Sequence, residues 1–268
     1  MNTRKTKVGF IGFGNIAGAV CDGLLTKKTV EPADVYACAR NFDKLKAKCG
    51  ARGINACESA AEVIAASDII VIGVLTDQVE SVVKENAEAL RGKPVFSLAS
   101  RVFCKDYVSY LGEGYNHICG LPNLAMASGE GIIVAEAEHT LTEEQLALFE
   151  GVFGQAAKIE YFSTGMMGVA DIGAGCAPAF ADMFIEALAD GLVKYGMPRA
   201  QAYSIVPQMM IGTAKYMMMS GRHPGDLKDS VCTPGGNTIK GISALEEKGF
   251  RYALISAVDK IMEKNPRG

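Results

Sequence analysis

The sequence of 268 residues contains no tryptophan, and its three histidines, His117, His139 and His223, lie far apart. Such dispersed histidines give no metal-binding triad, so we expect no metal. No charge of one sign dominates either, because 27 Lys and Arg residues face 30 Asp and Glu residues, which leaves a formal charge of -3. This balance argues against nucleic acid or an anionic membrane as a partner. We expect a small, diffusible ligand.

Long apolar runs and paired cysteines are also missing. The longest strongly apolar run, Ile69 to Leu75, is much shorter than the about 18 residues of a membrane-spanning helix, which predicts a soluble protein without membrane contact. The eight cysteines are scattered, form no CxxC pair and follow no positively charged, apolar leader. We therefore expect reduced thiols and a cytoplasmic location.

Glycine, in contrast, is abundant, with 30 residues, and the first of two glycine-rich turns follows a short apolar run near the N-terminus. The run Val8 to Ile11 leads into Gly12-Phe13-Gly14-Asn15-Ile16-Ala17, and a helical pattern follows. In this strand-turn-helix context a GxGxxG/A pattern predicts a dinucleotide site: Gly12 permits the turn, Gly14 lets the backbone approach a pyrophosphate, and Ala17 allows close helix packing. The pyrophosphate would lie at the helix N-terminus.

The end of the second predicted strand indicates which dinucleotide binds. An acidic residue there binds the 2′-hydroxyl of NAD, whereas an arginine accommodates the 2′-phosphate of NADP. The sequence has Arg40 and Asn41 at this point and no carboxylate. We predict NADPH as the cofactor, with NADH as the alternative.

Periodicity divides the chain into an α/β half and a helical half. Short β-branched runs alternate with amphipathic stretches up to about residue 163, a pattern typical of a parallel sheet wrapped by helices. We expect strands at 7–11, 34–39, 68–74, 94–98, 117–121, 132–136 and 159–162, and helices at 15–25, 42–49, 59–66 and 77–90. The predicted fold class is α/β: a Rossmann-type dinucleotide-binding domain, residues 1–163, and an all-helical dimerisation domain, residues 164–268.

In the helical half we expect a long helix that ends at Gly196, a second one over 200–219, and an amphipathic C-terminal helix. The first two are apolar over more than one stripe, so a domain of this size cannot bury them alone. The methionines among residues 209–219 could line a flexible groove, but a core or subunit interface is the preferred interpretation. We predict at least a homodimer.

A second glycine turn, Thr233-Pro234-Gly235-Gly236-Asn237-Thr238, precedes an amphipathic stretch from Ile239 to Leu245. Its backbone amides could hold a small carboxylate, and the Thr238 hydroxyl could reach a polar atom of the same ligand. Asn237 and Thr238 could equally be plain helix caps that bind nothing. The residues alone leave both interpretations open.

Several segments together resemble the pyrroline-5-carboxylate reductase family. In the second half they are Phe184 to Gly191, His223 to Asp229, Thr233 to Thr238, and Ala244 to Arg251. In the first half they are Gly12 to Ala17, Pro122-Asn123 and Gly129 to Gly131, so the similarity spans nearly the whole chain.

The resemblance implies reduction of a cyclic imine, 1-pyrroline-5-carboxylate, to L-proline by hydride transfer from the nicotinamide, as part of proline biosynthesis. It implies that the amides of Gly235, Gly236 and Asn237, together with Thr233, bind the substrate carboxylate, and that Thr238 is the catalytic contact to the ring nitrogen. It implies a helical domain that interlocks between subunits in dimers or rings of dimers. The cofactor residues would be Gly12, Phe13, Gly14, Asn15, Ile16, Arg40, Asn41, Val74, Leu75, Thr76 and Asn123, the last beside the nicotinamide or its ribose.

Three segments depart from the family pattern. Gly73-Val74-Leu75-Thr76 stands for Ala-Val-Lys-Pro, Pro122-Asn123-Leu124-Ala125 for Pro-Asn-Thr-Pro, and Gly175 to Phe180 for Gly-Ser-Gly-Pro-Ala-Tyr. Polar contacts near the nicotinamide are thereby lost. The alternatives are a reductase of another cyclic imino acid and a dinucleotide-binding paralogue without catalysis. A branched-chain hydroxyacid dehydrogenase is less favoured, because such an enzyme needs a catalytic lysine in the interdomain helix, and no lysine lies between Lys158 and Lys194. We expect Cys176 to pack and His223 to cap or pack.

Overall fold

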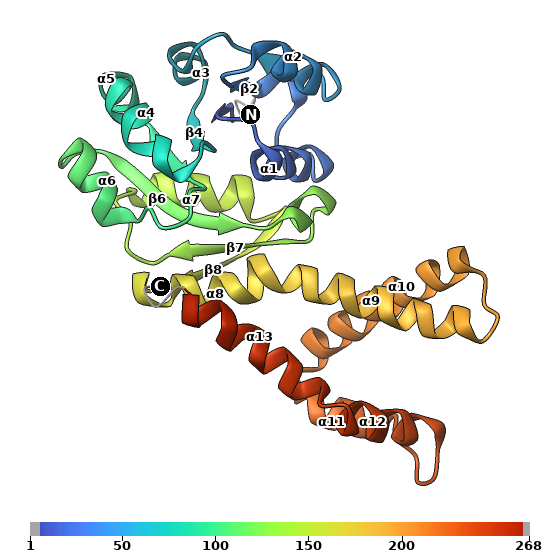
Figure 1. Ribbon diagram of the computed structural model, residues 1–268. Coiled ribbons are helices and arrows are strands. Elements are labelled where there is room, and N and C mark those ends of the chain that lie inside the picture. Colours follow the sequence, from blue (N-terminus) through green and yellow to red (C-terminus); the bar gives the residue numbers. More distant parts are fainter. Residues whose placement is uncertain (1–5, 265–268) are drawn as a thin grey trace. The chain divides into compact units, whose positions relative to one another are not determined.

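The computed structural model describes residues 6–264, and its internal contacts divide the chain after Gly175 into two compact units (Figure 1). The described part of the first unit ends at Gly175, and the second unit begins at Cys176. The boundary expected at residues 163/164 lies one helix earlier and stays a prediction. Each unit is described by itself below.

An eight-stranded sheet with the order β3-β2-β1-β4-β5-β6-β7-β8 forms the centre of the first unit. The strands are β1 (Val8–Ile11), β2 (Val35–Cys38), β3 (Asn55–Ala56), β4 (Ile69–Ile72), β5 (Pro94–Ser97), β6 (Asn116–Pro122), β7 (Gly131–Glu136) and β8 (Ala157–Phe162). Strands β1 to β6 are parallel, and the order reverses at β1, which pairs with both β2 and β4. This is the switch point at which open α/β sheets bind ligands.

Helices cover both faces of this sheet. They are α1 (Asn15–Thr26), α2 (Phe42–Gly50), α3 (Ala60–Ala66), α4 (Val79–Glu85), α5 (Ala87–Leu90), α6 (Cys104–Leu111) and α7 (Glu143–Phe153). Successive side chains of β4 point to opposite faces: Val71 joins the core under α1, α2 and α7, whereas Ile70 and Ile72 join the core under α3 to α6. Burial on both faces explains why β4 is an unbroken apolar run.

The sheet is mixed, which corrects the expectation of a parallel sheet. Strand β7 pairs antiparallel with β6, and β8 then pairs parallel with β7. The connection from β6 to β7 holds only the short 3₁₀ turn Leu124–Ser128, and so short a link cannot carry a chain back to the start of a parallel strand. Helix α7 supplies the longer crossover before β8.

Most expected elements lie within one or two residues of the observed ones, and the exceptions have local causes. The helix expected at 77–90 is split, because the Asn86 side chain donates to the Val82 carbonyl oxygen at 2.8 Å and competes with the backbone ladder. Helices α6 and α7 and strand β3 were not predicted. A capping box, in which Thr142 and Gln145 bond each other's backbone, marks the start of α7.

A continuous helical run leads from the first unit into the second. It consists of α8 (Thr164–Asp171), a π-helical turn (Ile172–Cys176) and α9 (Ala177–Lys194). By length and composition this run could cross a membrane, with a mean hydropathy of 1.3 over its most apolar window, of which 17% is buried. Small residues keep the mean hydropathy of this helix high without an unbroken run of large apolar side chains, and the expected absence of membrane contact stays a prediction.

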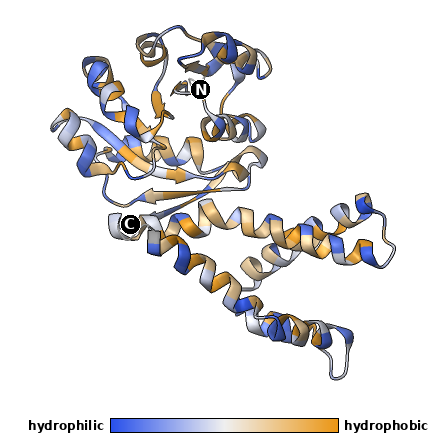
Figure 2. Ribbon diagram, in the orientation of Figure 1, coloured by the Kyte–Doolittle hydropathy of each residue, from blue (hydrophilic) through white to orange (hydrophobic). Residues whose placement is uncertain are grey.

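The second unit continues with α10 (Arg199–Ser220), α11 (Pro224–Ser230), α12 (Asn237–Glu247) and α13 (Phe250–Lys264). Figure 2 shows apolar positions along α9 and α10, and many of these side chains are exposed, including Met183 at 69%, Ile205 at 52% and Met218 at 67%. The helices are therefore present as expected, but within one chain they leave much apolar surface uncovered.

Candidate functional site

The first glycine turn joins three strands at the switch point of the sheet. Gly12 has φ +90°, and a Cβ atom there would lie 2.7 Å from the backbone of Gly73 and Val74, which follow β4. The Gly12 amide donates to the Cys38 carbonyl oxygen, at the end of β2, at 2.9 Å. Both the left-handed conformation and the close backbone contact therefore require glycine.

Gly14 has a different reason to be glycine. It is the N-cap of α1, no side chain caps this helix, and a Cβ atom on Gly14 would meet no protein atom within 4 Å. The space in front of Gly14 is thus open, and the first amides of a 12-residue helix have no capping side chain. An oxyanion such as a pyrophosphate fits this place, because free N–H groups and the helix dipole both favour it.

A cation that the sequence analysis missed lies beside this turn. The Phe13 ring is buried, at 5% exposure, and packs edge-on against Phe10, so Phe13 offers only its backbone to a ligand. The Lys48 ammonium, on α2, donates to the Phe13 carbonyl oxygen at 3.2 Å. Only the packing of α2 against the sheet brings Lys48 to the turn. Its charge adds to the anion preference of the α1 N-terminus.

The end of β2 brings Arg40 and Asn41 to the same edge of the sheet. Asn41 is the N-cap of α2, and its side-chain oxygen accepts from the Lys44 amide at 2.9 Å. The Asn41 amide nitrogen keeps its donors for another partner. The Arg40 side chain is exposed. A guanidinium and an amide donor at this position match a phosphate on the adenine ribose.

The segment after β4 is less polar than the cofactor edge of the family pattern. The Leu75 side chain is 63% exposed, and the Thr76 hydroxyl donates to the Ser100 carbonyl oxygen at 3.0 Å. Val74 is half-buried. These three predicted cofactor residues therefore lie at the carboxyl end of β4, beside Gly12, and offer mainly backbone and apolar groups.

The Asn123 side chain connects β6, β7 and the π-helical turn. Its oxygen accepts from the Ile132 amide at 3.3 Å, and its nitrogen donates to the Ala174 carbonyl oxygen at 3.0 Å. One N–H of the amide is left for a ligand. Asn123 follows β6 directly, so it lies at the same strand ends as the glycine turn, and its place beside the nicotinamide stays a prediction.

Asp171, the last residue of α8, is a further group that the sequence analysis did not single out. Burial raises the pKa of its carboxyl group above the usual value. A Cβ atom on Gly175 would lie 2.4 Å from the Asp171 Oδ1 atom, which explains the glycine at this position. Within residues 6–264, no hydrogen bond or ion pair holds this carboxylate.

The second glycine turn lies in the second unit, at the start of α12. Gly235 has φ +71°, and a Cβ atom on Gly236 would lie 2.3 Å from the Thr233 Oγ1 atom. Gly236 is the N-cap, so Asn237 and Thr238 are the first two helical residues, and no side chain caps the helix. Asn237 and Thr238 are therefore not the caps of this helix, and that interpretation was wrong. The N-terminus of this 11-residue helix is open to an anion.

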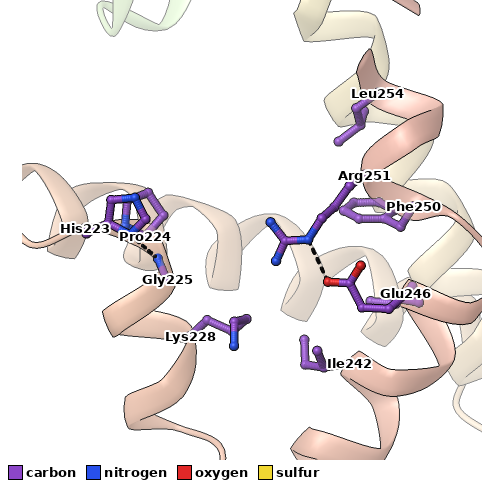
Figure 3. A pocket seen from close by; sticks show the side chains of 10 residues that line it. His223, Pro224, Gly225, Lys228, Ile242, Glu246, Phe250, Arg251 and Leu254 are labelled. Atoms are coloured by element: carbon purple, nitrogen blue, oxygen red, sulfur yellow. Dashed lines mark hydrogen bonds and ion pairs between the residues drawn. The ribbon is translucent and has the colours of Figure 1, made fainter. Parts of the chain in front are cut away.

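The second unit also contains a hollow of ≈ 530 Å³ between α11, α12 and α13 (Figure 3). Apolar side chains, among them Ile242, Phe250 and Leu254, line much of it. At its edge Arg251 forms an ion pair with Glu246 at 2.6 Å. The residues of the second glycine turn do not line this hollow. It is thus a separate apolar surface of the second unit.

Cysteine and histidine side chains are used for packing and capping. None of the eight cysteines, all of which lie within residues 6–264, forms a disulfide, and six of them are buried. Burial raises the pKa of Cys21 to about 12 and that of Cys38 to about 11, which disfavours the reactive thiolate. His223 is the N-cap of α11, and its Nδ1 atom accepts from the Gly225 amide at 3.0 Å, as the prediction of a capping role requires.

A doubly wound sheet with a glycine turn at the switch point, joined to a helical unit, defines the class of NAD(P)-dependent oxidoreductases with a Rossmann-type domain. Comparisons with known proteins agree. A family model for NADP oxidoreductase, coenzyme F420-dependent, matches residues 7–101, and one for pyrroline-5-carboxylate reductase dimerisation matches residues 166–267. Pyrroline-5-carboxylate reductase from Treponema pallidum (strain Nichols) is 42% identical over 255 residues, which cover 94% of this chain and 97% of the relative. The chain belongs to the pyrroline-5-carboxylate reductase family.

Two further relatives support the same assignment. Pyrroline-5-carboxylate reductase from Escherichia coli (strain K12) is 37% identical over 264 residues, 98% of each chain. The crystal structure of Plasmodium falciparum pyrroline carboxylate reductase with NADP bound has a TM-score of 0.84 at 25% identity, and the match covers 97% of this chain and 96% of that chain. The expected fold class, a Rossmann-type domain followed by a helical domain, is thereby confirmed, as is NAD(P)H as the cofactor class.

Proposed function

We propose that the chain reduces 1-pyrroline-5-carboxylate to L-proline with NADPH. The observation that carries the proposal is the uncapped N-terminus of α12, which directly follows Gly235 and Gly236. The chain is also 42% identical, over almost its whole length, to a protein named pyrroline-5-carboxylate reductase. An uncapped helix start suits a carboxylate, and the substrate carries one.

In this proposal the first unit binds the cofactor, which supplies the hydride when bound. The backbone of Gly12 to Ile16 holds the pyrophosphate, and Arg40 and Asn41 hold the 2′-phosphate. Val74, Leu75, Thr76 and Asn123 line the nicotinamide side. Arg40 and the absence of an acidic residue at the end of β2 favour NADPH over NADH.

The second unit binds the substrate. The amides of Gly235 and Asn237, with Thr233 beside them, hold the carboxylate, and Thr238 hydrogen-bonds the ring nitrogen. The Gly236 amide, expected in the same role, already donates to the Thr233 carbonyl oxygen at 2.9 Å and can serve the carboxylate only as a shared donor. A protonated imine is already electrophilic, so the chain needs to orient the ring rather than supply a strong acid or base. Thr238 is exposed at the second position of α12, which leaves its hydroxyl available.

The experiment is an assay of NADPH oxidation by purified protein with 1-pyrroline-5-carboxylate. Thr238→Val keeps the size of the side chain but removes the hydroxyl, and we expect kcat/KM to fall by about tenfold or more. Cys176→Ala, the matched control, should change kcat/KM by less than about twofold. If the control variant loses more activity than the Thr238 variant, the assigned roles are wrong.

Leu75 and Leu124 motivate a second candidate, reduction of a larger cyclic imino acid. Both side chains follow sheet strands at the cofactor edge and are exposed, at 63% and 58%, where the family pattern has Lys and Thr. An apolar edge suits a ring with an additional methylene group. Rates with five- and six-membered cyclic imino acids separate the two. Binding of NADPH without turnover of either substrate would instead support the non-catalytic paralogue.

We further propose that the chain forms homodimers, which can associate into rings, in the cytoplasm. The match of residues 166–267 to a dimerisation domain supports self-association, and the eight cysteines, which form no disulfide within residues 6–264, suit a reducing compartment. The apolar hollow between α11, α12 and α13 is a surface that helices of a second copy could fill.

A further inference from the structure

Gln78 contacts the side chain that is proposed to recognise the 2′-phosphate. Arg40 follows β2 and Gln78 is the N-cap of α4, after β4, so the two residues come from the strands on either side of β1. The Gln78 side-chain oxygen accepts from Arg40 Nη1 at 3.3 Å and from Nη2 at 3.2 Å. The carboxamide takes this orientation because the reverse one would place its own donors against the guanidinium.

We infer that Gln78 positions the Arg40 guanidinium for the 2′-phosphate and thereby sets the preference for NADPH over NADH. The inference rests on the cofactor assignment proposed above. Nothing in the family resemblance or in the comparisons assigns a role to Gln78. It acts through Arg40 and is therefore a positioning residue.

The donors of the guanidinium show how the contact can select a phosphate. Arginine has five N–H donors in one plane, and the Gln78 oxygen uses one from each terminal nitrogen. Three donors remain, including the one on Nε. That is enough for a paired contact to two phosphate oxygens, which is the strong form of arginine recognition.

The chemistry of the Gln78 side chain matters as much as its place. A carboxylate at this position would also hold the guanidinium, but it would neutralise the charge and repel the phosphate. A neutral amide orients Arg40 and leaves its full positive charge for the ligand. Because Arg40 is exposed, an unheld side chain would lose rotamer freedom on binding, and the Gln78 contact reduces this loss.

Asn41, the next residue in the chain, adds neutral donors. Its oxygen accepts from the Lys44 amide as the α2 cap, so its amide nitrogen and the amides of Phe42 and Asp43, at the start of this nine-residue helix, are left as donors. The three residues form a recognition set in which Arg40 supplies the charge, Asn41 supplies neutral donors, and Gln78 fixes the direction of the guanidinium.

The test measures ligand binding by titration calorimetry rather than turnover. The ligands are two pairs. NADP⁺ and NAD⁺ differ only in the 2′-phosphate. The second pair, 2′,5′-ADP and 5′-ADP, lacks the nicotinamide, and its members carry the second phosphate on the 2′-oxygen and on the 5′-phosphate, respectively. We expect Gln78→Ala to weaken binding of NADP⁺ and 2′,5′-ADP about fivefold to tenfold and to leave NAD⁺ and 5′-ADP within about twofold. Gln78→Glu should weaken the 2′-phosphate ligands by more than tenfold. Gln155→Ala, an exposed glutamine on the turn before β8, is the control and should change nothing.

Arg40→Ala separates the inference from the cofactor assignment. If Arg40→Ala lowers the ratio of NADP⁺ to NAD⁺ affinity and Gln78→Ala does not, the inference is overturned and the cofactor assignment stands. If neither variant lowers the ratio, the assignment of the 2′-phosphate site fails and the inference fails with it. In the Arg40→Ala background, Gln78→Ala should cause no further loss, because its effect passes through the guanidinium. An equal loss in both backgrounds would contradict the positioning role.

Discussion

The two units of the chain differ in where they place their apolar side chains. The first unit buries large side chains completely on both faces of a sheet, such as Phe10 and Phe96 on one face and Tyr107 on the other. In the described part of the second unit, the fully buried apolar residues are Ala189, Ala202 and Val206. The larger apolar side chains of α9, α10 and α13 are exposed or half-buried.

The first unit can therefore fold on its own core, whereas the second unit needs a partner to bury its apolar side chains. A sheet covered by helices on both faces supplies its own core, whereas helices that are apolar over several stripes must bury them against another surface. Soluble single chains rarely expose apolar area on this scale, and a second copy is the partner that the dimerisation match supports. The first unit should therefore tolerate changes in assembly, and the second should not.

The largest effect on the second unit is expected from a charge placed on the exposed apolar surface of α10. Ile205→Glu and Ile211→Glu alter side chains that are 52% and 49% exposed, so a lone chain should tolerate either. We expect loss of the dimer and a more than tenfold drop in reductase activity, because the charge would be buried in the subunit contact. Light scattering coupled to size exclusion measures the mass.

Val108→Glu, at a 36% exposed position on α6 of the first unit, is the matched control. Its mass and activity should equal those of the wild type. A wild-type mass for the two α10 variants as well would contradict the assignment of this surface to an interface.

A core truncation tests the first unit. Phe153→Ala removes a ring that packs against Phe96 and Phe149, at centroid distances of 5.0 and 5.3 Å, and should cost about 3–5 kcal/mol of unfolding free energy. Met218→Ala, at a 67% exposed position, should cost less than about 1 kcal/mol in a dissociated chain. Urea denaturation at low protein concentration measures both. Equal costs would remove the contrast between the two units.

Features of the fold were predictable from the sequence where their signals lie within a short segment. The turn Gly12 to Ala17 and the apolar strand β4 were predictable, because their signals lie within a few adjacent residues. Helix α7 also had a local signal, the Thr142 and Gln145 capping box, which was overlooked. Strand β3 had none, because Asn55 and Ala56 form a strand only through their pairing with β2.

Contacts between distant segments lay beyond the sequence. The Asn123 bond to Ala174 joins residues 51 positions apart, and the Lys48 bond to Phe13 joins residues 35 apart. Periodicity places such residues on elements but does not say which elements become neighbours. The second glycine turn was recognised as a motif, and only the structure showed that Gly236, rather than Asn237 or Thr238, is the cap.

A substitution at Gly14 sharpens the picture of the first unit as an independent nucleotide-binding module. Gly14→Val places a side chain in space that no protein atom occupies, so stability should change by less than about 1 kcal/mol. The same side chain blocks the place of the pyrophosphate, and NADP⁺ affinity should fall by more than about tenfold. Calorimetry and thermal unfolding check the two effects. A large fall in stability with unchanged affinity would show that the open space is not the ligand site.

The smallest expected effect concerns Asp171. Because burial raises its pKa in the folded state, the protonated form is favoured there, and this contribution to stability is lost as the pH rises through the raised pKa. Asp171→Asn keeps a neutral group, so the variant should be slightly more stable than the wild type at pH 7, by less than about 1 kcal/mol. The difference should vanish near pH 3. Melting temperatures across this range would contradict the account if the variant were less stable at pH 7.

The most direct measurement follows molar mass, NADPH affinity and reductase rate of the wild-type protein as its concentration is lowered. The account predicts a mass of at least two chains at working concentration. It further predicts that the rate per chain falls as the assembly dissociates, while NADPH affinity per chain is retained, because the first unit carries the cofactor site on its own core. A single chain that remains fully active, or a cofactor affinity that is lost together with the dimer, would contradict it.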